Sequence, residues 1–220
     1  MTESTYAQLV GLCAAVLLLS AVLIVWRRSL PAQIRLLAVQ GWALGVLVAV
    51  LGVHEGDVEL SLVALLVLAL KGVVLPRVLT RATVTEHGAL REETPLVNTT
   101  ASLILLALLT MLAYVVSRPV LALGSTSPLA AVPVGFAMTL FGFLVLSTRR
   151  HAVSQLIGFL LLDNGIGTVA FLTAGGVPLV VELGVSLDVL LVVLILQVLT
   201  SRIRAEFGDA DLDDLTELRD

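Results

Sequence analysis

The stretch Tyr6–Trp26 reads YAQLVGLCAAVLLLSAVLIVW and decides the class of fold, because it carries no charged residue over a length that crosses a bilayer. A helix of about 20 residues spans the hydrocarbon core of a membrane. Arg27 and Arg28 follow directly, where a signal peptide would have small residues, so we expect a retained helix. Of all 220 residues, 58% are hydrophobic and only 14% charged. A soluble domain has about 25% charged residues, so this composition predicts an integral membrane protein and excludes a large soluble domain.

Six further apolar segments of similar length predict an all-α, polytopic membrane helix bundle with about seven transmembrane helices. These segments are Pro31–Val53, Val58–Thr80, Leu96–Val116, Pro128–Ser147, Ala152–Ala174 and Pro178–Thr200.

The basic residues indicate which way the bundle faces. With seven spans, Arg118 lies alone on one side of the membrane, Lys71 lies inside a span, and the other eleven basic residues share the opposite side. Basic residues are enriched in cytoplasmic loops. We therefore expect the N terminus outside and the C terminus in the cytoplasm. The eleven are Arg27, Arg28, Arg35, Arg77, Arg81, Arg91, Arg149, Arg150, Arg202, Arg204 and Arg219.

Two parts of the chain resemble each other. RRSLPAQIRLLAVQGWALG from Arg27 aligns with RRHAVSQLIGFLLLDNGIG from Arg149, which places Gln33 over Gln155. The pattern predicts a tandem three-helix repeat joined by one linking helix, an architecture known in membrane proteins. The predicted division is a first repeat with its cytoplasmic loop at 1–95, a linking helix at 96–127, a second repeat at 128–204 and an acidic tail at 205–220.

Four ionisable residues fall within the predicted spans: Lys71, Asp163, Glu182 and Asp188. A charged Asp or Lys near a helix centre costs roughly 2.5–3.5 kcal/mol, so it needs a partner or a function. Lys71, Asp163 and Asp188 each lie roughly 15–20 Å along their helix from the membrane surface. This common depth favours a proton path in the membrane plane, with a structural Lys–Asp pair as the alternative. Glu182, near the outer surface, is either the mouth of that path or a solvated glutamate.

The residues beside these charges are also unusual for a span. Pro76 follows Lys71-Gly72 and removes a backbone hydrogen bond, which predicts a kinked helix that water can enter. Small residues after Asp163 allow a second helix or a water chain to approach closely. Gln40 is a further polar group within a span and needs a hydrogen-bonding partner.

The sequence predicts no cofactor in this chain. Cys13 is the only cysteine, which excludes a disulfide framework, iron–sulfur ligation and a thiolate zinc site. The segment 206–220 carries seven acidic residues and one arginine, and is either a solvated tail or a strap that docks a peripheral subunit.

Three segments together resemble a known family. They are LALKGVVLP from Leu68, LIGFLLLDNGIGTVAFLTAGGVPLVVELGVSLDVLLVVLILQVLTSRI from Leu156, and the closing DLDDLTELRD. Over nearly its whole length, and most specifically from Gln155 onward, the chain resembles hydrogenase-4 component E, a membrane subunit of complex-I-like respiratory hydrogenases. Its last three spans are similar to the K subunit of bacterial complex I. That resemblance places Asp188 at the second of the K subunit's two membrane glutamates, and Asp163 about one turn from the first.

The resemblance implies a non-redox subunit that contributes to proton or Na⁺ translocation and to assembly of the membrane arm. It implies a bacterial or archaeal cytoplasmic membrane, antiporter-like and other membrane-arm subunits as partners, and peripheral hydrogenase subunits that hold the nickel–iron and iron–sulfur centres. No nucleic acid is expected as a partner. Two alternatives remain open at this point: a subunit of a multisubunit cation/proton antiporter, and a purely structural membrane connector.

Overall fold

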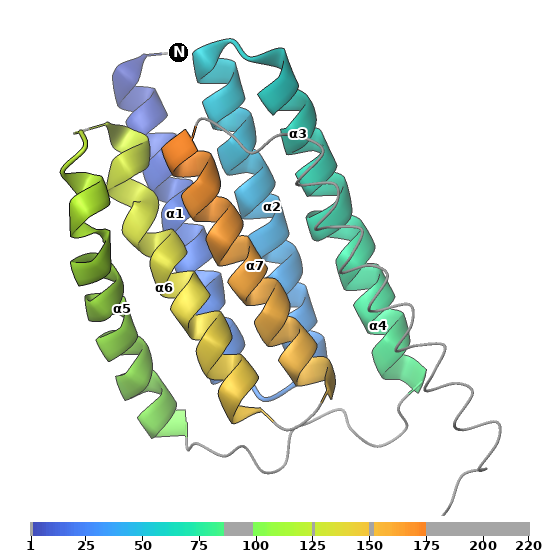
Figure 1. The fold of residues 1–220 in the computed structure, drawn as a ribbon. Coiled ribbons are helices and arrows are strands. Elements are labelled where there is room, and N and C mark those ends of the chain that lie inside the picture. Colours follow the sequence, from blue (N-terminus) through green and yellow to red (C-terminus); the bar gives the residue numbers. More distant parts are fainter. Residues whose placement is uncertain (1, 86–98, 125, 150–151, 175–220) are drawn as a thin grey trace, which may run out of the picture.

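The computed structural model describes residues 2–85, 99–124, 126–149 and 152–174, and every regular element there is helical (Figure 1). Helices α3, η1 and α4 follow one another without a break and form one span, so six helices within these described ranges are long and apolar enough to cross a membrane. The elements are α1 (Glu3–Trp26), α2 (Leu30–Glu55), α3 (Val58–Ala69), the π-helix η1 (Leu70–Val74), α4 (Leu75–Thr85), α5 (Thr99–Leu121), α6 (Ser127–Thr148) and α7 (Ala152–Ala174).

The predicted all-α membrane bundle is confirmed, and each of the first six predicted segments overlaps one of these spans; the largest shift is at Leu96–Val116, where the observed helix runs to Leu121. The seventh, Pro178–Thr200, lies outside the described residues, together with Glu182, Asp188 and the acidic tail.

The turn between α2 and α3 is short because two residues end one helix and begin the next. Gly56 takes the left-handed conformation at φ 71° and closes the last turn of α2. Asp57 then caps α3, since its carboxylate accepts hydrogen bonds from the backbone N–H groups of Glu59 at 2.8 Å and Leu60 at 3.2 Å. This turn holds α2 and α3 antiparallel and in contact.

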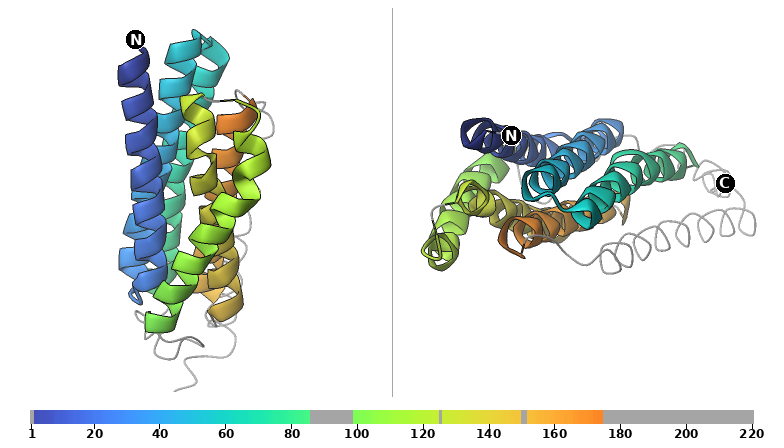
Figure 2. Two further views of the ribbon diagram at one scale, coloured as in Figure 1. Left: turned by 90° about the vertical axis from the view of Figure 1, so that its left-hand side faces the viewer. Right: turned by 90° about the horizontal axis from the view of Figure 1, so that it is seen from above.

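The helices form two rows that pack face to face. One row is α1, α2 and α3, and the other is α5, α6 and α7, with α1 against α6 and α2 against α7 (Figure 2). The core between the rows is apolar and includes the fully buried side chains of Leu17, Leu44, Phe141 and Leu161. The rows therefore bring the middle of α2 beside the middle of α7.

Glycines set the close packing of α6 on α7. A Cβ placed on Gly142 would lie 2.5 Å from the Cβ of Leu162, and one on Gly165 would lie 2.5 Å from the backbone nitrogen of Thr139. Small residues let membrane helices approach until their backbones touch. These contacts fix the position of α7, and so of the polar residues that it carries.

Charges of opposite sign gather at opposite ends of the bundle. The C-terminal ends of α1, α4 and α6 lie at the lower end of the bundle in Figure 1, and arginines lie at or next to these ends. The opposite end carries acidic residues at the start of α1 and around the α2–α3 turn. The arginines at the first end are Arg27, Arg28, Arg81 and Arg149. Which end faces the cytoplasm stays a prediction.

Candidate functional site: a buried ion pair and an amide cluster

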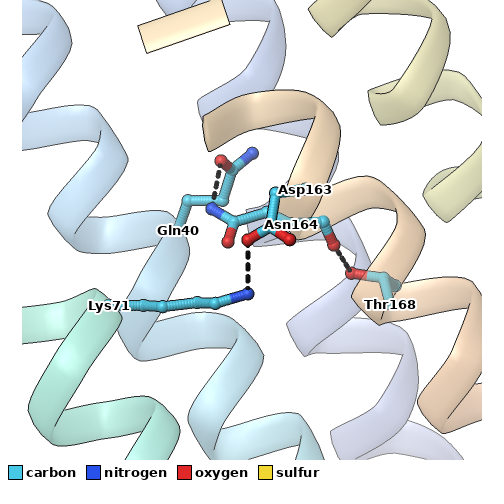
Figure 3. Close-up of polar contacts among 5 residues, drawn as sticks. All are labelled: Gln40, Lys71, Asp163, Asn164 and Thr168. Atoms are coloured by element: carbon cyan, nitrogen blue, oxygen red, sulfur yellow. Dashed lines mark hydrogen bonds and ion pairs between the residues drawn. The ribbon is translucent and has the colours of Figure 1, made fainter. Parts of the chain in front are cut away.

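Lys71 and Asp163 form an ion pair inside the bundle. The Nζ of Lys71 donates to the Oδ2 of Asp163 at 2.8 Å, and 92 residues of chain separate the two (Figure 3). Their side chains are 3% and 16% exposed, so both charges are largely removed from solvent and lipid. The sequence predicted that they share a depth, and the structure shows that they meet.

The backbone at Lys71 is π-helical. Within η1 the N–H of Leu75 donates to the carbonyl of Leu70, one residue farther back than in an α-helix. Pro76 follows and has no N–H to donate to the preceding turn. The disturbance expected at the proline therefore takes the form of a widened turn that carries the buried lysine. Single π-turns of this kind are frequent at functional sites.

Helix α2 touches the backbone of this widened turn. A Cβ placed on Gly41 would lie 2.5 Å from both the carbonyl carbon and the carbonyl oxygen of Lys71. Glycine is therefore needed at position 41 for α2 to pack against η1. Helix α7 leaves more space on the other side of Lys71. A Cβ placed on Gly167 of α7 would lie 3.9 Å from the Nζ of Lys71, which is an ordinary contact distance.

A cluster of uncharged polar groups lies next to the ion pair. The amide nitrogen of Asn164 donates to the Oε1 of Gln40 at 3.0 Å, and the hydroxyl of Thr168 donates to the backbone carbonyl of Asn164 at 2.7 Å (Figure 3). The Nε2 of Gln40 reaches the carbonyl of Leu17 in α1 at 3.4 Å. The sequence marked Gln40 as a buried group in need of a partner, but hydropathy alone could not identify Asn164 as that partner.

The two sets of contacts meet on one turn of α7, because Asp163 and Asn164 are neighbours. Polar groups thus run across the bundle from α1, through α2 and α7, to η1. Of these groups, Lys71 and Asp163 can exchange a proton, whereas the amides of Gln40 and Asn164 can only donate and accept hydrogen bonds. The arrangement can hold a proton, or a cation that takes the place of the ammonium, at the ion pair.

A second polar site lies at the acidic end of the bundle. The imidazole of His54 stacks on the ring of Tyr6, with ring centroids 3.7 Å apart, and its Nε2 lies 3.5 Å from the Oε1 of Glu3. These residues and Thr173 line a cavity of about 610 Å³. The sequence offered no signal that α1 and the end of α2 would meet in this way.

Within the part of the chain that the structure describes, no three His, Cys, Asp or Glu side chains are placed to hold a metal ion. Two of the four predicted relay residues, Lys71 and Asp163, are brought together, while Glu182 and Asp188 lie outside the described residues.

The chain is similar to a mycobacterial protein and to hydrogenase-4 component E of enteric bacteria. It is 51% identical over 220 residues to "Uncharacterized protein Rv0085" of Mycobacterium tuberculosis, a match that covers the whole of both chains. It is 30% identical over 116 residues to hydrogenase-4 component E of Escherichia coli and of Shigella flexneri, which covers 53% of this chain and 54% of theirs. No family model and no solved structure matches.

Proposed function

The chain belongs to the family of the mycobacterial protein Rv0085, and about half of it is similar in sequence to hydrogenase-4 component E. On this basis we propose that it is a non-redox membrane subunit of a complex-I-like hydrogenase. In this role it contributes to proton or Na⁺ translocation and helps to assemble the membrane arm. The redox centres reside in partner subunits, and antiporter-like membrane subunits are its neighbours in the bilayer.

The observation that carries the proposal is the buried pair of Lys71 and Asp163, joined at 2.8 Å. When a proton arrives at the carboxylate of Asp163, the attraction that holds the ammonium of Lys71 is lost. The ammonium, on its flexible four-carbon stem, then has to find another partner or release its proton. Proton occupancy is thereby coupled to a charge movement in the membrane plane. Asp188 is proposed as the next titratable group of this relay, and Glu182 as its outer mouth.

The same ion pair favours a second candidate, the structural connector. A direct bond between η1 and α7 holds two rows of helices together, and removing one partner of a buried pair typically costs about 3–5 kcal/mol. A relay and a connector therefore predict the same loss when either charge alone is removed, as in Asp163→Asn, whereas Lys71→Arg keeps the pair and removes only the readily exchanged proton. Replacing both residues at once separates them.

The test compares the single variants Lys71→Arg and Asp163→Asn with the double variant Lys71→Met/Asp163→Leu, measuring assembly on native gels and proton uptake in inverted membrane vesicles. The double variant leaves no unpaired buried charge, so assembly should return toward that of the unaltered protein. A relay then predicts that proton uptake stays lost in the assembled complex. Recovery of uptake together with assembly would support the connector.

Thr168 provides a matched control on α7. Thr168→Val removes a buried hydroxyl from the same helix, one turn beyond Asn164, without changing any titratable group. We expect normal assembly and normal proton uptake. Asp188→Asn should reduce proton uptake while leaving assembly intact.

The antiporter alternative differs in its partners. Affinity purification of the full chain in mild detergent, followed by mass spectrometry, should recover nickel–iron hydrogenase subunits under the present proposal. A complete set of cation/proton antiporter subunits would contradict it.

The orientation is part of the proposal as well. We place the arginine-bearing end in the cytoplasm, with the N terminus outside. An alkaline phosphatase fusion near residue 55 should then be active and one near residue 86 inactive, and the reverse result would overturn the orientation.

A further inference from the structure

A groove opens between α2 and the segment formed by η1 and α4. Its volume is about 550 Å³. Three exposed arginines line it, Arg35 from α2 and Arg77 and Arg81 from α4, together with the apolar side chains of Ala38, Trp42 and Pro76. The groove therefore combines positive charge with an apolar wall, although it lies on a membrane-spanning helix pair.

The outermost arginines and the innermost apolar residues lie at different depths along the helix axes. On α2, Arg35, Ala38 and Trp42 follow one face, and Trp42 lies about 10 Å deeper in the bundle than Arg35 at about 1.5 Å per residue. On the antiparallel wall, Val73 lies about 12 Å deeper than Arg81 by the same spacing. The outer part of the groove, toward the end of the bundle, is therefore basic, and we call it the rim. The inner part, toward the middle of the bilayer, is apolar.

We propose that this groove binds an anionic phospholipid of the surrounding membrane. The guanidinium groups at the rim match the phosphate of the headgroup, because a guanidinium can donate two parallel hydrogen bonds to phosphate oxygens. The first part of an acyl chain lies along Ala38 and the half-exposed indole of Trp42. Basic pockets between transmembrane helices are known binding sites for anionic lipids.

The acidic tail of the same chain is the competing occupant, because 206–220 carries seven acidic residues. Its charge would suit the rim of the groove. The innermost part, however, is lined by Ala38, Trp42 and Val73, and carries no positive charge to pair with a carboxylate. An amphipathic lipid matches both parts of the groove, and an acidic peptide matches only one.

The fluorescence of Trp42 provides the measurement. The full chain carrying Trp26→Phe keeps Trp42 as its single tryptophan and can be reconstituted into phosphatidylcholine vesicles. Brominated acyl chains quench nearby tryptophan. We expect brominated phosphatidylglycerol to quench Trp42 more strongly than brominated phosphatidylcholine at the same mole fraction. Arg77→Gln should lower this preference about two- to five-fold, the effect of one basic residue at an anionic membrane surface.

Two variants make the result specific to the groove. Arg118→Gln removes an arginine from α5 at the opposite end of the bundle, and should leave the preference unchanged. Ala38→Phe keeps every arginine but fills the apolar part, and should reduce the preference.

Equal quenching by the two lipids would overturn the proposal, and so would an unchanged preference in Ala38→Phe. A preference that emerges only after deletion from Gly208 onward would identify the acidic tail as the occupant, and would overturn it too.

Discussion

The helix pairs α1–α2 and α6–α7 share one local structure at the arginine-bearing end. In each pair the first helix ends at an arginine with extended backbone, at ψ 139° for Arg27 and 142° for Arg149. In each pair a glutamine of the next helix donates its Nε2 to that arginine's carbonyl, at 2.6 Å from Gln33 and 3.0 Å from Gln155. This correspondence agrees with the predicted tandem repeat, which stays a prediction.

The pairs differ at the middle of the membrane. At the offset that aligns the two arginines, Gly41 of α2 corresponds to Asp163 of α7. Gly41 meets the backbone of Lys71, whereas Asp163 bonds to its side chain. The two helix pairs therefore have the same turn at their arginine-bearing end. At aligned positions farther along, however, one pair contacts the backbone of Lys71 through a glycine and the other binds its ammonium through a carboxylate.

The largest expected effect comes from adding a methyl group on each side of Lys71. Gly41→Ala would bring a Cβ to 2.5 Å from backbone atoms that no side-chain movement can relieve, so we expect a loss of about 3 kcal/mol in unfolding free energy. Gly167→Ala would meet only the Nζ of Lys71, at 3.9 Å, and should change stability by less than about 0.5 kcal/mol. Thermal unfolding in detergent measures the stability of both variants. Equal losses of stability would contradict the expectation that α2 packs more tightly than α7 against Lys71.

A smaller effect on stability is expected from substitutions at the two corresponding glutamines, Gln33 and Gln155. Gln33 is buried and also donates to the carbonyl of Ile24, whereas Gln155 is exposed. Gln33→Ala should cost about 2 kcal/mol through lost packing and hydrogen bonds, and Gln155→Ala less than about 0.5 kcal/mol. Denaturation in mixed micelles compares the two variants. Equal losses would mean that the hydrogen bond from each glutamine to the arginine carbonyl, and not the burial of the side chain, determines the stability of both turns.

The smallest effect concerns the contact that ties the two pairs together. Gln40 and Asn164 join α2 to α7 by a hydrogen bond of 3.0 Å. A double-mutant cycle with Gln40→Leu and Asn164→Leu should give a coupling of about 0.6–1 kcal/mol, the range found for hydrogen bonds between membrane helices. A coupling near zero would mean that the amides are held in place by packing alone.

The sequence by itself determined where the chain crosses the membrane. Hydropathy is a property of each segment alone. Six of the seven predicted spans fall in the described residues and are found there, and the gathering of arginines at one end and the shared depth of Lys71 and Asp163 likewise followed without knowledge of any contact. The repeated Arg-to-Gln spacing was visible for the same reason, because each glutamine bonds to a carbonyl six residues back on its own chain.

Only the tertiary structure decided which faces of the helices meet. A hydropathy profile gives depth but not rotation about the helix axis, and rotation decides that Lys71 points at Asp163 and Gln40 at Asn164. The rotation depends on contacts between backbones, such as that of Gly41 with Lys71, and on the widened turn of η1, which shifts the facing of every residue after it. The same two features hold Arg35 and Arg77, distant in sequence, along one groove.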